Sequence, residues 1–199
     1  MTVVHGDALE VDLQSLVDPD RPSLVVSNVP YGITSPLLFR FLDLRPFPRK
    51  LVLLVQREVA ERIAAGPGNK VYGALSVGVQ ARGTVRLAFR VGRKAFRPVP
   101  AVESALLVIE PRRAGPSAQA LDDLRALTRT AFSRRRKQLG TILRASSDYA
   151  LPEGRLEAVL GDLDISPSAR PETLSSQQFM DLASALRAAA EAREGKGAR

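Results

Sequence analysis

Two short apolar runs constrain the fold of this chain more than any other feature of its sequence. Leu24–Asn28 and Lys50–Gln56 are almost continuously apolar, and each has the length of a single β-strand. Such runs are typical of parallel strands that are buried on both faces and joined by helical crossovers. Helical patterns follow both runs, at Pro36–Leu44 and Arg57–Ala65. The sequence therefore predicts an α/β fold built on a parallel sheet.

The rest of the chain extends this pattern and then changes character. Further strands are predicted at Thr2–His5, Thr84–Val91 and Ser104–Glu110, and a further helix at Tyr72–Arg82. The residues Ala114-Gly115-Pro116-Ser117 then have the composition of a hinge. The later elements are all predicted to be helical: Ala118–Phe132, Arg135–Ala145, Pro152–Leu160 and Ser175–Ala190. We therefore predict an α/β domain over residues 1–113, an all-α domain over residues 114–190 and a disordered tail over residues 191–199.

The loop Asn28-Val29-Pro30-Tyr31 ends the first apolar run, where α/β proteins place catalytic loops. The Asn28 amide oxygen and the Val29 carbonyl could both accept N–H bonds from the exocyclic amine of a nucleobase, which favours a tetrahedral, nucleophilic nitrogen. Pro30 stiffens the turn, and Tyr31 offers a ring for stacking on a base, a contact of about 1–3 kcal/mol. A capped turn with a packed tyrosine is the alternative interpretation.

Two further positions carry possible chemistry. Asp7, in His5-Gly6-Asp7-Ala8, could accept a hydrogen bond from the adenine amino group of a nucleotide-like cofactor, although capping a turn is the commoner use of such an aspartate. Phe96 lies on the proline-rich loop Ala95–Ser104, where it could stack on a base opposite Tyr31 or pack internally. His5 is the single histidine, so histidine catalysis and histidine metal sites are not expected.

The basic charge is concentrated in one stretch of the chain. Between Arg82 and Arg144 there are 15 Lys and Arg against 4 acidic residues, an excess of 11, whereas the whole chain carries +8. The densest part is Arg134-Arg135-Arg136-Lys137, which the helical pattern places at a helix end. A phosphate backbone is the partner that such a patch fits, and a solvated face is the alternative.

Composition excludes several classes of protein. The 199 residues include no cysteine, which excludes disulfides and thiolate metal sites and fits a reducing cytoplasm. The longest apolar stretches, Leu51–Val55 and Ala105–Ile109, are too short to span a membrane. We expect a cytoplasmic protein that is monomeric and contacts no membrane.

Several blocks in this order together resemble one known family. The blocks are Asn28–Tyr31, Val55–Arg62, Ala65–Gly73, Phe96–Ala105, Ala131–Leu139 and Arg170–Ser175. At this spacing the chain, up to about Leu186, is similar to the small-subunit (16S) ribosomal RNA adenine N6,N6-dimethyltransferases of the KsgA type.

The resemblance implies a fold, a reaction and a set of site residues. It implies a Rossmann-like class I S-adenosylmethionine-dependent methyltransferase sheet with a small all-α C-terminal domain that binds RNA. Two adjacent adenosines near the 3′ end of small-subunit rRNA would be dimethylated, on a 30S precursor particle, without a metal. On this reading Tyr31 and Phe96 are the stacking pair, while Asn28 contacts both cofactor and amine. The resemblance also places Asp7 and Ala8 at the cofactor and, at the RNA, Arg97, Arg134, Arg135, Arg136 and Lys137.

The sequence departs from the family at three substituted positions and at its N-terminal end. Leucine, asparagine and aspartate are more usual than Val29, Gly32 and Glu103. The family has two βα units ahead of the segment that begins here, about 60–80 residues, which include a glycine-rich cofactor loop that this sequence lacks. We expect an N-terminally truncated form that binds the cofactor weakly or not at all and that leaves two apolar strand edges unpaired. A catalytically impaired RNA-binding fragment and a large-subunit rRNA adenine methyltransferase are the alternatives.

Overall fold

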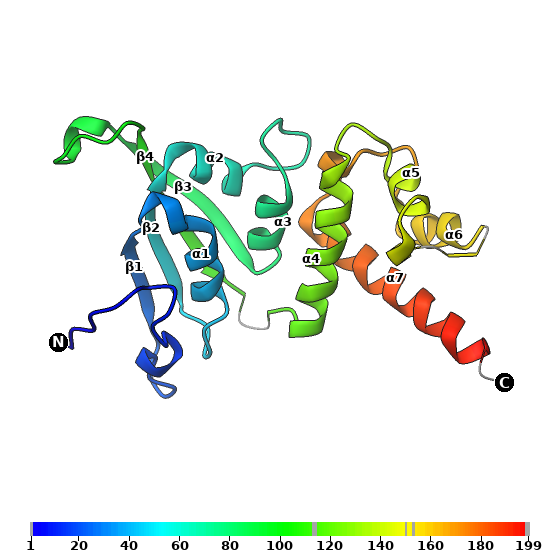
Figure 1. Ribbon diagram of the computed structural model, residues 1–199, viewed down its shortest axis with the longest axis horizontal. Helices are drawn as coiled ribbons and strands as arrows, with labels where there is room; N and C mark the ends of the chain where they lie inside the picture. The colour runs from blue at the N-terminus through cyan, green and yellow to red at the C-terminus, as the bar shows by residue number, and fades with distance from the viewer. Residues whose placement is uncertain (1, 113–114, 150, 153, 198–199) are drawn as a thin grey trace. The chain divides into compact units, whose positions relative to one another are not determined.

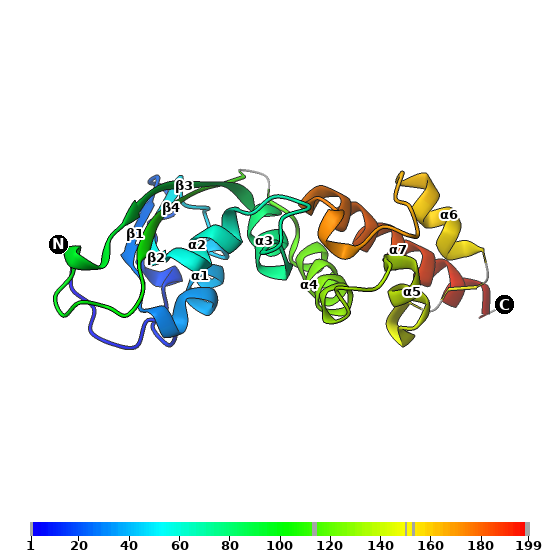
Figure 2. The ribbon, with the colours of Figure 1, turned by 90° about the horizontal axis from the view of Figure 1, so that it is seen from above.

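The structure is a computed structural model that describes residues 2–112, 115–149, 151–152 and 154–197 (Figures 1 and 2). The chain divides into two compact units: Met1–Ala64 with Arg82–Gly115, and Ala65–Ala81 with Pro116–Arg199. The predicted boundary between residues 113 and 114 lies outside the described residues. The structure differs from the predicted division in one segment, because Tyr72 and Val77 pack into the core of the helical unit.

The first unit is built on a four-stranded sheet in the order β1-β2-β4-β3. The strands are β1 (Leu24–Asn28), β2 (Lys50–Gln56), β3 (Gly83–Val91) and β4 (Ser104–Pro111). β1 and β2 are parallel, as predicted, whereas β4 is antiparallel to both of its neighbours. In this register Asn28 is opposite Leu54, and Ser104 is opposite both Gln56 and Val91. The carboxyl ends of β1, β2 and β3 therefore meet the amino end of β4 at one end of the sheet.

Helices α1 (Thr34–Leu42) and α2 (Arg57–Ala64) cover one face of this sheet (Figures 1 and 2). Leu51, Leu53 and Val55 of β2 are fully buried on that face. β1 has the predicted bounds, but the prediction that it is buried on both faces is wrong. Leu24 and Val26 are 65% and 76% exposed, because β1 is an edge strand whose second face carries no helix among the described residues.

The predicted strand at Thr2–His5 does not form. These residues are exposed and have no regular structure. A strand needs a hydrogen-bonding neighbour, and residues 2–5 pair with none of the four described strands. The short 3-10 helices η1 (Gln14–Leu16), η2 (Tyr31–Ile33) and η3 (Arg93–Ala95) complete this unit.

The second unit is helical, as predicted. It contains α3 (Ala74–Gln80), α4 (Ala118–Ser133), α5 (Leu139–Arg144), α6 (Arg155–Asp162) and α7 (Ser176–Gly197), with η4 (Ser147–Tyr149) and η5 (Pro171–Thr173). Its core includes Leu124, Leu127 and Phe179. α7 continues to Gly197, so the residues 191–197 that were expected to be a disordered tail are helical; residues 198–199 lie outside the description. Over the described chain, no helix combines the length and apolarity that crossing a membrane requires.

Candidate active site

The loop after β1 leaves one side-chain amide unused. The backbone N–H of Val29 donates to the Leu54 carbonyl at 3.0 Å, which continues the β1–β2 pairing by one residue. The Ile33 N–H donates to the Pro30 carbonyl at 3.2 Å and closes the turn that follows. The exposed side chain of Asn28 has no hydrogen-bond partner in the described part of the chain. Its amide oxygen is therefore available to a ligand.

Two loops that are far apart in the sequence line one cavity at this end of the sheet. The cavity has a volume of about 300 Å³ and is lined by Asn28, Val29, Pro30, Tyr31, Phe96, Arg97, Pro98 and Pro100. The structure thus brings the whole Asn28–Tyr31 tetrapeptide together with Phe96. Tyr31 and Phe96 are each half-buried, so both rings keep exposed surface that a flat ligand can contact.

Ser104 holds Tyr31 from the start of β4. The Tyr31 hydroxyl and the Ser104 hydroxyl are 2.8 Å apart, and Ser104 is fully buried. No local sequence pattern indicates this contact, because Ser104 is 73 residues from Tyr31 and has the pattern of an ordinary strand residue.

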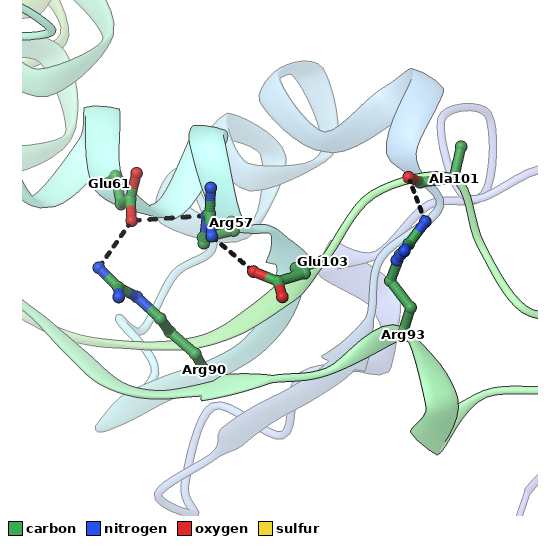
Figure 3. Close-up of polar contacts among 6 residues, drawn as sticks. All are labelled: Arg57, Glu61, Arg90, Arg93, Ala101 and Glu103. Atoms are coloured by element: carbon green, nitrogen blue, oxygen red, sulfur yellow. Dashed lines mark hydrogen bonds and ion pairs between the residues drawn. The ribbon is translucent and has the colours of Figure 1, made fainter.

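Linked charged side chains lie at the two ends of the loop that carries Phe96, a region that we call the neck of the loop (Figure 3). Arg57 Nη1 of α2 is 2.5 Å from Glu103 Oε2, and Arg57 Nε is 3.7 Å from Glu61 Oε1. Glu61 Oε1 also accepts a hydrogen bond from Arg90 of β3 at 3.0 Å. Arg93 Nη1 donates to the Ala101 carbonyl at 3.4 Å. The loop from residue 93 to residue 103 is therefore fastened at both ends, a feature that sequence reasoning missed.

The other predicted cofactor residues do not line this cavity. Asp7 is exposed, and its Oδ1 accepts the backbone N–H of Leu9 at 2.8 Å, which is the turn-capping contact of the alternative interpretation. The Ala8 carbonyl accepts a hydrogen bond from Arg40 Nη1 of α1 at 2.7 Å. Of the predicted cofactor set, only Asn28 is among the described residues that line the cavity.

The predicted RNA-binding residues fall in both units. Arg97 lines the cavity in the sheet unit, whereas Arg134–Lys137 lie in the helical unit. The prediction of a helix from Arg135 is wrong: α4 ends at Ser133, the Lys137 N–H donates to the Arg134 carbonyl at 2.8 Å in a turn, and α5 begins at Leu139. The N–H of the buried Leu139 is held by the Ala169 carbonyl at 2.7 Å, so it donates outside a helix that would begin at Arg135.

Solved structures identify the class of fold. A dimethyladenosine transferase from Plasmodium falciparum matches with a TM-score of 0.76 and 28% identity, over 90% of this chain and 70% of that one. A 23S rRNA methyltransferase, ErmE, matches with a TM-score of 0.65 over 92% of this chain and 71% of its own, and its 24% identity supports the fold alone. The fold is the Rossmann-like fold of rRNA adenine methyltransferases, with a helical unit attached.

The sequence comparisons narrow the class to one family. The family model for ribosomal RNA adenine dimethylase matches residues 1–188, and the chain belongs to that family. Relatives named ribosomal RNA small subunit methyltransferase A are 40% identical in Phenylobacterium zucineum and 39% identical in Maricaulis maris, each over 96% of this chain. The chain spans 64% and 66% of the length of these two relatives.

Proposed function

We propose that this chain transfers methyl groups from S-adenosylmethionine to the N6 amines of two adjacent adenosines near the 3′ end of small-subunit rRNA. The observation that carries the proposal is the cavity where Asn28 and Tyr31 meet Phe96 at the carboxyl ends of β1 and β2. Catalytic loops of α/β sheets lie at such ends. Family membership and the names of the relatives support rRNA adenine as the substrate. A monomer that acts on a 30S precursor in the cytoplasm completes the proposal.

The chain's own residues prepare the amine. The lone pair of an exocyclic amine is delocalised into the ring, which makes the nitrogen a poor nucleophile. Asn28 Oδ1, which has no partner within the described chain, and the Val29 carbonyl would accept the two N–H bonds and favour the tetrahedral nitrogen. As the nitrogen bonds to the methyl carbon, the bond from that carbon to the donor sulfur would break, and the methylated nitrogen would then release its proton to water. Positioning and desolvation contribute more to such a transfer than a strong base does.

The rings hold the base. An adenine flipped out of its helix would stack on Tyr31 and be covered by Phe96, each ring contributing about 1–3 kcal/mol. A second transfer requires a site that admits an amine already carrying one methyl group, and the cavity has a volume of about 300 Å³.

The chain has some of the groups that a methyl donor needs. S-Adenosylmethionine supplies a methyl group on a positively charged sulfur when it is bound. Asn28 has a free amide at the cavity, and Asp7 has an exposed carboxylate that could accept the adenine amino group. We propose these two residues, with the backbone at Ala8, as its contacts.

Transfer of labelled methyl groups to unmodified small-subunit particles tests the proposal. At a high concentration of S-adenosylmethionine, which compensates for weak cofactor binding, we expect the 199-residue chain to incorporate label. Asn28→Ala should lower the rate about 100-fold, since single polar contacts to a reacting group are worth about 10²–10³. Asn28→Asp keeps one acceptor oxygen and should retain more activity than Asn28→Ala. Thr84→Ala is the control, because Thr84 is exposed and lies opposite Glu110, away from the site. No incorporation by the unsubstituted chain, or full activity of Asn28→Ala, contradicts the proposal.

A second candidate function is RNA binding without catalysis. One observation that favours it is that Asp7 and Ala8 are not among the residues that line the cavity. Another is that the helical unit has its own core and an exposed basic turn. Binding of small-subunit RNA by a chain that incorporates no label would select this candidate. Incorporation of label into large-subunit rRNA would instead indicate a large-subunit rRNA adenine methyltransferase.

A further inference from the structure

We propose that Glu103 and Ser104, at the start of β4, position the two rings of the cavity, Tyr31 through Ser104 and Phe96 through Glu103. The proposal rests on the proposed function of the cavity as an adenine site. Neither residue lines that cavity, so both act through other side chains. We call them the positioning pair.

Ser104 fixes the orientation of Tyr31. Ser104 is fully buried and its hydroxyl is 2.8 Å from the Tyr31 hydroxyl, while Tyr31 follows β1, which lies two strands away from β4. Tyr31 lies in the three-residue helix η2, which has no side-chain cap. The hydroxyl contact therefore ties the tip of the ring to a rigid strand, and that contact restricts tilting of the plane on which a base would stack.

Glu103 fixes the loop that carries Phe96. Its backbone carbonyl accepts the Arg57 N–H at 2.9 Å, and its carboxylate meets the guanidinium of the same arginine at 2.5 Å. The other end of the loop is closed by Arg93, which donates to the Ala101 carbonyl. Phe96 sits between these two fastenings, and its N–H donates to the Arg93 carbonyl at 3.2 Å.

The ion pairs at this neck suit positioning better than stability or RNA binding. The side chains of Arg57 and Glu103 are 45% and 44% exposed, and pairs this exposed stabilise a fold by only about 0–1 kcal/mol. Arg57 pairs with Glu103 and shares Glu61 with Arg90, so the two arginines are balanced by two carboxylates and Arg57 is not a free cation for phosphate. Loss of the Glu103 charge should therefore leave the fold intact and change the placement of the loop.

The first test observes Tyr31 without any catalysis. The chain has three tyrosines, so labelling with 3-fluorotyrosine gives three fluorine NMR signals, which single Tyr→Phe substitutions assign. We expect Ser104→Ala to shift and narrow the Tyr31 signal while the signals of Tyr72 and Tyr149 stay in place. Thr84→Ala is the control and should move none of them. An unchanged Tyr31 signal in Ser104→Ala would overturn the role of Ser104 even if the chain proved not to be a methyltransferase.

The second test compares two glutamates at opposite ends of β4. Glu103→Gln removes the carboxylate at the neck, and Glu110→Gln removes one that pairs with Lys50 at 3.0 Å at the far end of the sheet. With 2-aminopurine in place of the target adenosine in small-subunit RNA, we expect Glu103→Gln to reduce the fluorescence change on binding about threefold. Glu110→Gln should match the unsubstituted chain. RNA affinity itself should change less than twofold, because phosphate contacts dominate it.

Methyl transfer adds a kinetic readout. We expect Glu103→Gln to lower the single-turnover rate about tenfold at saturating RNA with little change in KM, since small misplacements of a reacting group lower rates up to about 10²-fold. Glu103→Asp keeps the carboxylate and should recover part of the rate. Equal effects of Glu103→Gln and Glu110→Gln, or an effect confined to KM, would overturn the proposal. Absence of transfer in the unsubstituted chain would instead refute the proposed function, and the fluorine and 2-aminopurine signals would still decide the positioning role.

Discussion

At the scale of single residues, Tyr72 has a buried hydroxyl without a partner among the described residues. Its ring packs edge-on against Phe132 in the helical core, with centroids 6.3 Å apart. An unsatisfied buried polar group costs about 1–3 kcal/mol, and Tyr72→Phe removes the group while it keeps the ring. We expect Tyr72→Phe to raise the free energy of unfolding at pH 7 by about 1 kcal/mol, measured by urea denaturation. A lower stability would show that the hydroxyl is satisfied in solution.

The same hydroxyl predicts a pH dependence. Burial raises the pKa of Tyr72 from 10.0 to about 12. Because the pKa of Tyr72 is higher in the folded state than in the unfolded state, the folded state holds this proton more tightly. The free energy of unfolding is therefore unaffected by this titration below pH 10 and falls as the pH rises towards 12. Burial and the nearby Asp148 also raise the pKa of Tyr149 to about 12. Tyr72→Phe should therefore reduce, and not abolish, the alkaline loss of stability, and Tyr149→Phe serves as the comparison.

Some residues of the candidate site are predictable from the sequence, and others are not. The sequence predicts that Asn28, Tyr31 and Phe96 share one site, since proline-stiffened loops with an amide and two rings are typical of a base site. Their roles in catalysis stay predictions. The contacts of Ser104 and Arg57 were missed, because they join residues that are 73 and 46 positions apart and depend on the antiparallel register of β4. Local patterns carry no information on such a register.

At the scale of secondary-structure elements, the start of α4 depends on one side chain. Ser117 has extended backbone angles, and its hydroxyl oxygen accepts the Ala120 N–H at 3.2 Å, which satisfies a donor that the helix leaves free. Ser117→Ala should lower the free energy of unfolding of the helical unit by about 1 kcal/mol, because α4 buries Leu124 and Leu127 in its core.

The opposite end of α4 provides the control for this prediction. The Ser133 hydroxyl donates to the Thr130 carbonyl at 2.8 Å, a contact that satisfies no free N–H donor. Ser133→Ala should change the urea midpoint by much less than Ser117→Ala, and Ser117→Asp should retain the cap and interact favourably with the helix dipole. Equal midpoints for the two alanine variants would refute a capping role for Ser117.

The elements predicted best are those whose pattern is local. β1 and β2 have the bounds expected from their apolar runs, since side-chain burial alone specifies them. The prediction of a strand at Thr2–His5 is wrong because a strand needs a neighbouring strand to pair with, and the local sequence pattern does not show whether one is present. α3 begins at Ala74, two residues later than expected, because Gly73 adopts an extended conformation and its N–H donates to Ser76 Oγ at 3.1 Å.

At the scale of the whole molecule, the basic charge is divided between the two units. The stretch from Arg82 to Arg144, with its excess of 11 positive charges, includes β3 and the Phe96 loop in one unit and α4 and the Arg134–Lys137 turn in the other. Within the sheet unit, Arg82 pairs with Asp43 and Arg90 pairs with Glu61. In the turn, Arg134, Arg136 and Lys137 are exposed and have no ion pair in the described part of the chain. The turn therefore places three such cations within four consecutive residues, which makes it a candidate for phosphate contacts.

The salt dependence of RNA binding tests the role of the turn. Each phosphate contact adds about 0.7–0.9 to the slope of log K against log salt, because it releases counterions. Replacing Arg134, Arg135, Arg136 and Lys137 by glutamine should reduce the slope for small-subunit RNA by about 3. A charge-matched control replaces four other exposed cations by glutamine: Arg21, Arg49, Arg155 and Arg170. This control lowers the net charge equally but should reduce the slope by less than about 1, since long-range attraction is screened within a Debye length of about 10 Å. Equal slopes for the two variants would mean that total charge, and not the turn, determines RNA binding.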